Sequence, residues 1–552
     1  MRRALITYGL ISLVVSAVLV AGAVSMFQSL VSYRNPFPVR QDFAASGHGP
    51  ALTQHVVLVV VDGLRVDTAR TMQAFRPNQI PVPYRGGQLS VSLPTYSLPT
   101  WAVIGTGTTQ AVTGVAMNLY RQPAISNIFA KAKAAGLSTA MVAGTGWDDL
   151  YGKWIDRKYV FPGELAEAEI ARRAADMAAT ASLTLAYFPR ADEVAHALGA
   201  DSRQYAEAAA AIDKALLQLL DSVDLTTTTV IITADHGHVA AGGHGGPEPD
   251  VTTAPLVMYG QVIQPGPGIA GKQTDIAPTV AALLGIGYPD FVQGEPLVDA
   301  IASSSLERDA IVAAWAAQVE KGTVALLPAL GAVVRPISGS TPRERAEACL
   351  ARYDAAVAAL AARDMWTPGR WAAFAATVAV AALIAVSLRR YTTRASVLGA
   401  LTGVAVTAVA ALVGPLRLTF SSLTGPAQVI LALAGYAAAG LLATLSMMVV
   451  ARNRGQSVPF RTWAFALVQV QIVVFGFAAG LHVLRGPALI SGYMPDFAYW
   501  LLKVFLSGYA AVGNIVMLAG LLPVWLISRW AARHTVDSPT LIVPLPGRHE
   551  PS

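Results

Sequence analysis

Apolar residues dominate the N-terminal segment and the last third of the chain, and a long, more polar stretch lies between them. A helix needs about 20 apolar residues to cross the hydrocarbon core of a bilayer, and six runs come close to that length. We predict an α-helical transmembrane bundle with one N-terminal and five C-terminal spans. The predicted spans are residues 4–26, 370–388, 395–416, 427–450, 462–484 and 499–527.

The first apolar run has a second interpretation, because a cleaved signal peptide also places basic residues before an apolar stretch. Residues 4–26 follow Arg2 and Arg3. The run is long for a signal peptide, and no clear small-residue cleavage site follows it closely. We therefore expect an uncleaved anchor.

Arginines beside the predicted spans indicate the topology, because Lys and Arg are enriched in cytoplasmic loops. The opposite loops of the bundle carry only Arg417 and Arg485. We predict a multi-pass cell-membrane protein with both termini in the cytoplasm and residues 27–369 outside it. The arginines on the predicted cytoplasmic side are Arg2, Arg3, Arg389, Arg390, Arg394, Arg452, Arg454, Arg461, Arg529 and Arg533.

The polar stretch contains short, almost continuous apolar runs separated by helical patterns. Such runs are typical of buried parallel strands, and their alternation with helices is typical of an α/β fold. We predict a mainly parallel sheet flanked by helices. The predicted strands are 55–62 (HVVLVVVD), 137–143 (LSTAMVA) and 229–235 (TVIITAD), and the predicted helices are 125–135, about 164–181 and 202–221.

These features divide the chain into six segments. An N-terminal anchor and a linker precede the α/β domain, and a helical connector, a five-span bundle and a disordered cytoplasmic tail follow it. In the connector, Thr341 and Glu344 fit a capping box with Pro342 at the first helical position. The predicted bounds, in chain order, are 1–27, 28–54, 55–300, 301–369, 370–530 and 531–552.

Composition agrees with a membrane protein. Hydrophobic residues make up 54% of the chain and charged residues 13%, which is too apolar for an ordinary soluble enzyme. The net charge of +6 is carried largely by the arginines beside the spans, so we expect no binding to a nucleic-acid polymer. The single cysteine, Cys349, excludes an intrachain disulfide framework.

A cluster of histidines follows the last predicted strand. The stretch ADHGHVAAGGHGG, residues 234–246, holds Asp235, His236, His238 and His244. A polar surface loop is one interpretation, and a metal site is the other, because imidazole and carboxylate are common metal ligands. Asp62 and Asp235 both fall at the carboxyl ends of predicted strands, where ligands bind in such folds.

A second pair of candidate ligands stands earlier in the chain. Asp192 and His196 are four residues apart, so on a helix both side chains share one face and could hold one ion. A solvated helix face is the alternative interpretation of this pair.

Five motifs in this region resemble the alkaline phosphatase superfamily, in its phosphodiesterase and phosphoethanolamine-transferase branches. They occur in the family's order across roughly residues 55–297 and include a metal-ligand strand, a nucleophile turn, an Asp-x-x-x-His pair and a closing histidine segment. The motifs are VVVDGLRVD, LPTYSLPTWAVIGTGTTQAVTGVAMN, DEVAH, TADHGHVAAGGHGG, and KQTDIAPTVAALLGI followed by GEPL.

The resemblance implies a site with two divalent metal ions, zinc by analogy, although sites of this kind also accept manganese. Residues Asp62, Asp235 and His236 would hold one ion together with the oxygen of the nucleophile, Ser97. The second ion would be held by Asp192, His196 and His244.

The nucleophile turn carries further implications. Ser97 falls where the family has its reactive Thr or Ser, and coordination by a metal would lower the pKa of its hydroxyl. Thr95 and Thr100 are rival hydroxyls, whose alternative role is turn capping. Asn118 lies at the spacing of the asparagine that binds a phosphoryl oxygen in the phosphodiesterase branch.

The chain also departs from the family's pattern. A nonpolar residue, commonly Met, often stands at the position of His238, so this side chain either lies behind the metal ligands or is exposed, and we expect it to be exposed. Sulfatases share the fold, but their motif needs an arginine where this chain has Trp101 in SLPTW, which argues against a formylglycine sulfatase.

One anchor before the domain and five spans after it resemble the layout of glycosylphosphatidylinositol ethanolamine-phosphate transferases. We therefore expect Ser97 to transfer a phospholipid head-group phosphate to a lipid or glycan acceptor. The alternatives are a phosphodiesterase or nucleotide pyrophosphatase that hydrolyses its substrate, and an inactive scaffold or transporter. The predicted spans lack mid-span carboxylates, which disfavours an ion-coupled transporter.

Overall fold

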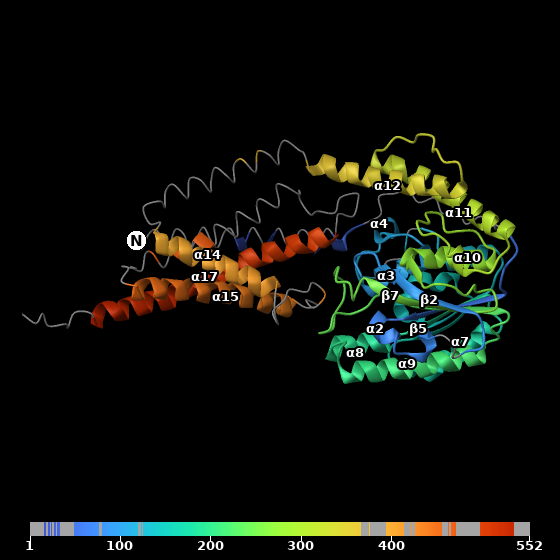
Figure 1. The fold of residues 1–552 in the computed structure, drawn as a ribbon, viewed down its shortest axis with the longest axis horizontal. Helices are drawn as coiled ribbons and strands as arrows, with labels where there is room; N and C mark the ends of the chain where they lie inside the picture. Colours follow the sequence, from blue (N-terminus) through green and yellow to red (C-terminus); the bar gives the residue numbers. More distant parts are fainter. Residues whose placement is uncertain are drawn as a thin grey trace, which may run out of the picture.

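The computed structural model of the 552-residue chain describes residues 49–365 apart from 77–79, 120–122 and 124, and then residues 393–412, 426–454 and 497–534. It also describes scattered residues between 16 and 33, residues 372, 375 and 421, and some residues between 462 and 470. Figure 1 shows an α/β part and a separate group of long helices beside it.

The α/β part is built on one sheet of eight strands in the order β4-β3-β5-β1-β6-β7-β2-β8. Among the described strands only β7 runs antiparallel to its neighbours, β6 and β2. The predicted mainly parallel sheet is therefore confirmed. The strands are β1 (His55–Val61), β2 (Tyr84–Ser90), β3 (Thr139–Gly144), β4 (Arg157–Phe161), β5 (Leu183–Phe188), β6 (Thr228–Ala234), β7 (Thr253–Tyr259) and β8 (Ile269–Lys272).

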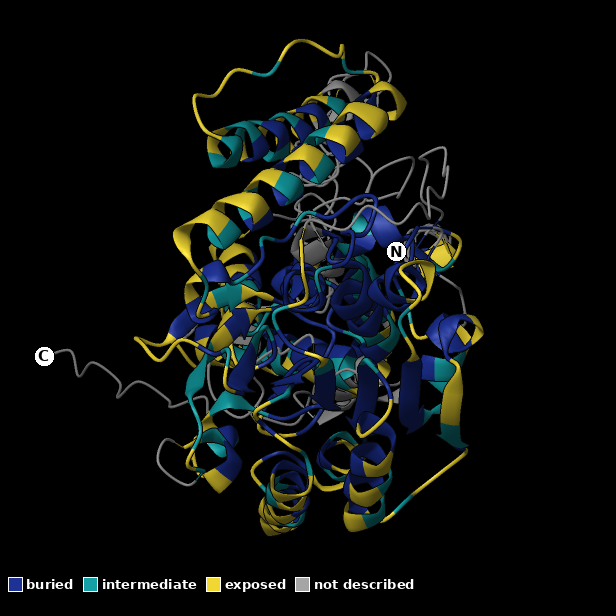
Figure 2. Ribbon diagram, turned by 90° about the vertical axis from the view of Figure 1, so that its right-hand side faces the viewer, coloured by how far each residue is buried: buried dark blue, intermediate teal, exposed yellow. Residues whose placement is uncertain are grey.

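Helices cover both faces of the sheet, and the central strands are buried between them (Figures 1 and 2). Strand β1 pairs in parallel with β5 on one side and with β6 on the other. The helices of one face are α7 (Glu167–Ala178), α8 (Arg190–Leu198) and α9 (Arg203–Ser222), and the other face carries α3 (Ser97–Thr106), α5 (Ile128–Ala134) and α10 (Ile276–Leu284).

The three predicted strands correspond to β1, β3 and β6, and the three predicted helices to α5, α7 and α9. Five strands were not predicted. One of them, β5 (LTLAYF), is apolar and has six residues, as the predicted β3 has, so its length does not explain the omission. By contrast, β2 (YRGGQLS) has two glycines and no apolar alternation. Such segments become strands because neighbouring strands pair with them, and tertiary context of this kind overrides weak local preference.

Two helices follow the sheet, α11 (Ser305–Leu326) and α12 (Pro342–Met365). The indole of Trp315 in α11 is buried and donates a hydrogen bond of 2.7 Å to the Gly294 carbonyl, which ties α11 to the α/β part. The predicted capping box of α12 is confirmed, since Thr341 and Glu344 exchange side-chain to backbone hydrogen bonds of 3.2 Å.

Among the described residues, two helices are long and apolar enough to cross a membrane, Ser305–Leu330 and Ile430–Asn453. The first lies in the predicted connector, and the second corresponds to the predicted span 427–450. Two shorter apolar helices are Arg394–Ala410 and Leu506–Leu522.

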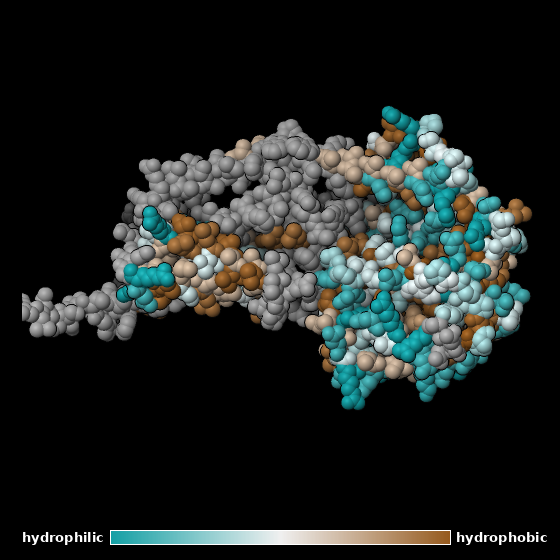
Figure 3. Space-filling model, viewed as in Figure 1, coloured by the Kyte–Doolittle hydropathy of each residue, from teal (hydrophilic) through white to brown (hydrophobic). Residues whose placement is uncertain are grey.

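Helices α14 (Arg394–Leu412) and α17 (Phe497–His534) both pack against α15 (Pro426–Asn453). Their outer surface is apolar, and Figure 3 shows brown side chains along it. The predicted spans 4–26, 370–388 and 462–484, most of the linker 28–54 and the tail beyond 534 lie wholly or largely outside the described residues. The six-span bundle therefore stays a prediction.

Helix α5 offers a matched test of buried against exposed ion pairs. Lys131 lies 2.8 Å from Asp290, and both side chains are buried. We expect Lys131→Met to lower the free energy of unfolding by about 3–5 kcal/mol, because it removes one partner of a buried ion pair. Unfolding of the detergent-purified protein by denaturant measures this.

The control is Lys133→Met on the same helix. Lys133 pairs with Asp156 at 2.7 Å, but these side chains are 46% and 42% exposed. Its loss should cost no more than about 1 kcal/mol. Equal effects of the two substitutions would contradict the expectation.

Candidate metal centre and nucleophile

Three carboxylates meet at the carboxyl edge of the sheet. Asp62 directly follows β1 and Asp235 directly follows β6, while Asp192 lies in α8, just after β5. Because β5, β1 and β6 are adjacent and parallel, their carboxyl ends lie together. The sheet topology therefore assembles acidic groups that are up to 173 positions apart in the chain.

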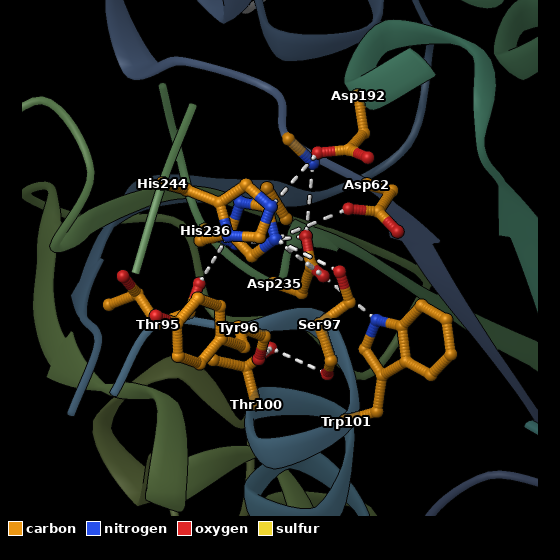
Figure 4. A network of polar contacts seen from close by, with 12 residues as sticks. Asp62, Thr95, Tyr96, Ser97, Thr100, Trp101, Asp192, Asp235, His236 and His244 are labelled. Carbon is orange, nitrogen blue, oxygen red and sulfur yellow. Dashed lines mark hydrogen bonds and ion pairs between the residues drawn. The ribbon is translucent and has the colours of Figure 1, made fainter. Parts of the chain in front are cut away.

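The first group of candidate ligands consists of Asp62, Asp235 and His236, whose ligand atoms all lie within 4.8 Å of one another. The Nε2 atom of His236 is 3.4 Å from Asp62 Oδ1 and 3.3 Å from Asp235 Oδ2. The hydroxyl of Ser97 lies 3.3 Å from the same Nε2 atom (Figure 4). The side chains expected at the first ion are thus brought together.

The second group consists of Asp192, His196 and His244. The Nε2 atoms of the two histidines are 3.0 Å apart, and they lie 3.4 Å and 3.5 Å from Asp192 Oδ1. The predicted placement of Asp192 and His196 on one helix face is confirmed by α8. The rings of His236 and His244 stack with centroids 3.7 Å apart, so the two groups adjoin.

The hydrogen bonds of His236 and His244 leave one ring nitrogen of each free to bind a metal ion. His236 Nδ1 faces the Gly237 carbonyl at 3.2 Å, and His244 Nδ1 faces the Thr95 carbonyl at 2.7 Å. Because a carbonyl only accepts, each Nδ1 carries the proton and each Nε2 keeps its lone pair. In addition, Asp62 Oδ1 is buried and has no hydrogen-bond partner within the described part of the chain. These unshared lone pairs fit a divalent cation.

Electrostatics also favour a cation in this site. Burial, together with Asp235 and Asp192, raises the pKa of Asp62 well above its usual value, and burial raises the pKa of Asp235 to about 6. Burial lowers the pKa of His236 to about 3 and that of His244 well below its usual value, which keeps both imidazoles neutral. In the described residues these carboxylates form ion pairs only with histidines.

The nucleophile turn distinguishes the three rival hydroxyls. Ser97 is the first residue of α3, so its hydroxyl lies at the partly positive end of a ten-residue helix. The Thr95 hydroxyl accepts a hydrogen bond from the Gly245 amide at 2.8 Å, and the Thr100 hydroxyl bonds to the carbonyls of Tyr96 and Ser97. Only the Ser97 hydroxyl faces the candidate ligands (Figure 4).

Asn118 lies beside this turn. Its Oδ1 atom accepts a hydrogen bond of 3.0 Å from the Leu98 amide, next to the Ser97 backbone. The side chain is exposed. The Oδ1 contact fixes the amide group and leaves its NH₂ donors available to a ligand at Ser97.

The expected exposure of His238 is wrong. Its side chain is fully buried, and its Nε2 atom lies 2.8 Å from Asp192 Oδ1. The loop after β6 turns back on itself at Gly242 and Gly243, both with positive φ, and folds the ring inward. The polar, glycine-rich segment suggested a surface loop, but the glycines permit the tight turn that buries this histidine.

Two aromatic residues were not predicted as part of the site. The Trp101 indole donates a hydrogen bond of 2.8 Å to Asp235 Oδ2, and the Tyr187 hydroxyl donates to Asp62 Oδ2. The two rings pack edge to face with centroids 5.0 Å apart. Trp101 lies four residues after Ser97 on α3, so the helical spacing could have indicated that both side chains share the face at the site. No sequence pattern indicated the role of Tyr187 on β5.

Residues of the helical part contact the site. The Ser421 hydroxyl accepts a hydrogen bond of 3.0 Å from the Gly246 amide and donates one of 2.6 Å to Glu248. An apolar cluster also lies against the nucleophile turn. It consists of the buried residues Leu30, Tyr33, Ala116 and Trp500, with Leu93, Tyr96, Met117 and Val504 packed against them.

Comparison with known proteins agrees with this geometry. Residues 127–246 match the family described as Type I phosphodiesterase / nucleotide pyrophosphatase. The chain is 32% identical over 111 residues to GPI ethanolamine phosphate transferase 3 of Schizosaccharomyces pombe, covering 19% of this chain and 12% of that protein. It is 22% identical over 324 residues to GPI ethanolamine phosphate transferase 2 of Aspergillus fumigatus, covering 50% and 42%.

The chain thus spans less than half the length of these two relatives. Among solved structures, murine ectonucleotide pyrophosphatase / phosphodiesterase 5 aligns with a TM-score of 0.37 and 13% identity, covering 45% of this chain and 100% of that one. The resemblance to the phosphodiesterase and phosphoethanolamine-transferase branches of the alkaline phosphatase superfamily is confirmed.

The aromatic donors provide a test of the metal centre. We expect Trp101→Phe and Tyr187→Phe each to weaken zinc binding by about 10- to 100-fold, because each leaves a ligand carboxylate without the donor that orients it. Titration of the purified protein against a competing chelator measures the affinity.

The matched control is Tyr151→Phe in the same aromatic cluster. The Tyr151 hydroxyl bonds to the Trp101 carbonyl at 2.8 Å, and its hydrogen bonds within the described residues go to backbone carbonyls rather than to carboxylates. Zinc affinity should be unchanged in this variant. An equal loss in all three variants would show that packing, rather than carboxylate orientation, sets the affinity.

Proposed function

We propose that the protein is a membrane-bound, two-metal phosphoryl-transfer enzyme that acts outside the cytoplasm. Ser97 takes a head-group phosphate, phosphoethanolamine-like, from a phospholipid and passes it to a hydroxyl of a lipid or glycan acceptor. The observation that carries this proposal is the Ser97 hydroxyl, which lies 3.3 Å from His236 Nε2, where the two groups of candidate ligands adjoin.

Two sets of residues would hold the metal ions, which are zinc or manganese. When bound, two divalent ions would stabilise the attacking and leaving oxygens of an in-line phosphoryl displacement. One set, with the Ser97 oxygen, is Asp62, Asp235 and His236, and the other is Asp192, His196 and His244.

The reaction takes place in two displacements at phosphorus. The Ser97 oxygen forms a bond to phosphorus while the bond to the diacylglycerol oxygen breaks, and diacylglycerol leaves with the proton that Ser97 gives up. In the second step the acceptor oxygen attacks the same phosphorus, the bond to Ser97 breaks, and the acceptor proton returns the serine hydroxyl. Splitting the transfer in this way is nucleophilic catalysis.

Two further groups would stabilise the phosphoryl oxygens. The Ser97 amide, at the first position of α3, has no partner within the helix and would donate to a phosphoryl oxygen bound at this helix end. The amide of Asn118, fixed by Leu98, adds a neutral donor at the same place. Donors that are already in place cost no reorganisation as charge develops in the transition state.

The apolar cluster around Tyr96 supports a lipid donor. Tyr96 precedes the nucleophile directly and packs with Leu30, Tyr33 and Trp500, which come from the N-terminal segment and from α17. A phosphate bound at Ser97 would therefore lie next to apolar helices, as the head group of a phospholipid does. The relatives named as GPI ethanolamine phosphate transferases support the same substrate class.

Hydrolysis is the second candidate function. The match of residues 127–246 to the Type I phosphodiesterase / nucleotide pyrophosphatase family favours an enzyme in which water takes the acceptor's place. An inactive scaffold is disfavoured, because all six candidate ligands and Ser97 converge on one site.

Ser97→Ala tests the proposal. The purified, zinc-loaded protein is given phosphatidylethanolamine labelled in its head group, together with a total membrane-lipid extract. We expect wild type to move the label into a new lipid and Ser97→Ala to lose at least about 10³-fold in rate, because the covalent intermediate cannot form.

The control is Thr100→Ala, which removes a hydroxyl one turn further along α3 whose partners among the described residues are the backbone carbonyls of Tyr96 and Ser97. Its rate should stay within about tenfold of wild type. Release of a water-soluble labelled head group would indicate the hydrolase. No turnover of this lipid or of a nucleotide diester, with no bound metal, would contradict both functions.

Asn118→Asp tests the amide donor separately. The substitution keeps the oxygen that accepts from Leu98 but removes the NH₂ group and adds a negative charge beside the phosphate. We expect kcat to fall by about 10²- to 10³-fold while zinc binding is unchanged. Steady-state kinetics and chelator titration measure the two quantities. A normal kcat would show that Asn118 does not contact the phosphoryl group.

A further inference from the structure

His238 is a fourth histidine at the candidate metal centre, and it has no role in the function proposed above. It forms a cluster with Asp192 and His196 whose ligand atoms lie within 4.8 Å of one another, as metal ligands do. Its ring is also buried, and its Nε2 atom is 2.8 Å from Asp192 Oδ1. Distance alone therefore does not distinguish a ligand from a residue that orients a ligand.

The hydrogen bond at the other ring nitrogen makes the distinction. The backbone amide of Gly243 donates to His238 Nδ1 at 2.9 Å. Because an N–H group only donates, Nδ1 holds a lone pair, and the proton of the neutral imidazole lies on Nε2. His236 and His244 are the reverse, since their Nδ1 atoms face carbonyls. A nitrogen that carries a proton has no lone pair for a metal ion.

We propose that His238 is a positioning residue, which donates its Nε2 proton to Asp192 Oδ1 and holds that carboxylate in place for the second ion. The inference rests on the proposed function in one respect, that the site binds divalent metal. In most metal sites a histidine binds the ion and a carboxylate orients that histidine. Here the roles are reversed, because the carboxylate is the candidate ligand and the histidine orients it.

The fold holds the ring in this orientation from two sides. A short turn follows His238, in which the Gly242 amide donates to Val239 and the Val239 amide donates to Gly243, and this turn aims the Gly243 amide at Nδ1. On the other side, a Cβ atom at Gly63 would lie 2.6 Å from His238 Nε2. Only glycine at position 63, directly after Asp62, leaves room for the ring.

The test compares His238→Met with His238→Gln, using zinc and cobalt as probes in the full-length, detergent-purified protein. Met removes the N–H donor, and Gln can supply one from its own side-chain amide. We expect His238→Met still to bind two ions, with the affinity for one of them reduced by about 10- to 100-fold, and His238→Gln to recover most of that loss. The visible spectrum of the cobalt form should keep its intensity, because the number of ligands is unchanged.

Loss of one ion in His238→Met, or a changed cobalt spectrum, would show that His238 is a ligand and would overturn the inference. Unchanged zinc affinity would overturn it as well. Thermal unfolding of the metal-free variants checks that they fold, and His55→Gln, at the opposite end of β1, controls for the loss of an imidazole. A wild type that binds no metal would instead overturn the proposed function itself, which is a different pattern of results.

Discussion

The parallel pairing of β1 with β5 and β6 is the constraint on which the rest of the site depends. It brings Asp62, Asp192 and Asp235 to one edge of the sheet, where Asp62 and Asp235 are buried and Asp192 is half-buried. Carboxylates gathered with so little contact to water repel one another and are costly to ionise unless a cation or hydrogen-bond donors compensate. The hydrogen-bond donors around these carboxylates can be understood as compensation for this concentration of negative charge.

Neutral hydrogen-bond donors compensate part of this charge. Trp101, Tyr187 and His238 each give a single hydrogen bond to a different carboxylate, Asp235, Asp62 and Asp192 respectively. Neutral donors orient a carboxylate and leave its negative charge in place. An arginine or lysine would instead cancel that charge. Burial acts to raise the pKa of Asp192, but the bond from His238 and the nearby His244 and His236 bring it below its usual value. The charge is thus kept for a divalent ion.

The nucleophile side of the site is held by a chain of contacts that reaches the apolar helices. The Thr95 carbonyl accepts from His244, its hydroxyl accepts from Gly245, and the next amide, at Gly246, donates to Ser421. Tyr96 packs into the apolar cluster that includes Trp500. Metal ligands, nucleophile and apolar helices are therefore mechanically connected, which fits a substrate with a polar head and an apolar body.

Local sequence pattern determined a large part of this protein. Continuous apolar runs predicted β1, β3 and β6, and the four-residue spacing predicted that Asp192 and His196 share a helix face. The tertiary structure decided which hydroxyl faces the ligands, that His238 is buried, and that Trp101 and Tyr187 orient carboxylates. Periodicity indicates which face of an element is buried over a few residues, whereas the proton position of His244 depends on a partner, Thr95, that is 149 positions away. Such partners meet only when the sheet has assembled, because strand order, rather than chain order, sets which side chains share an edge.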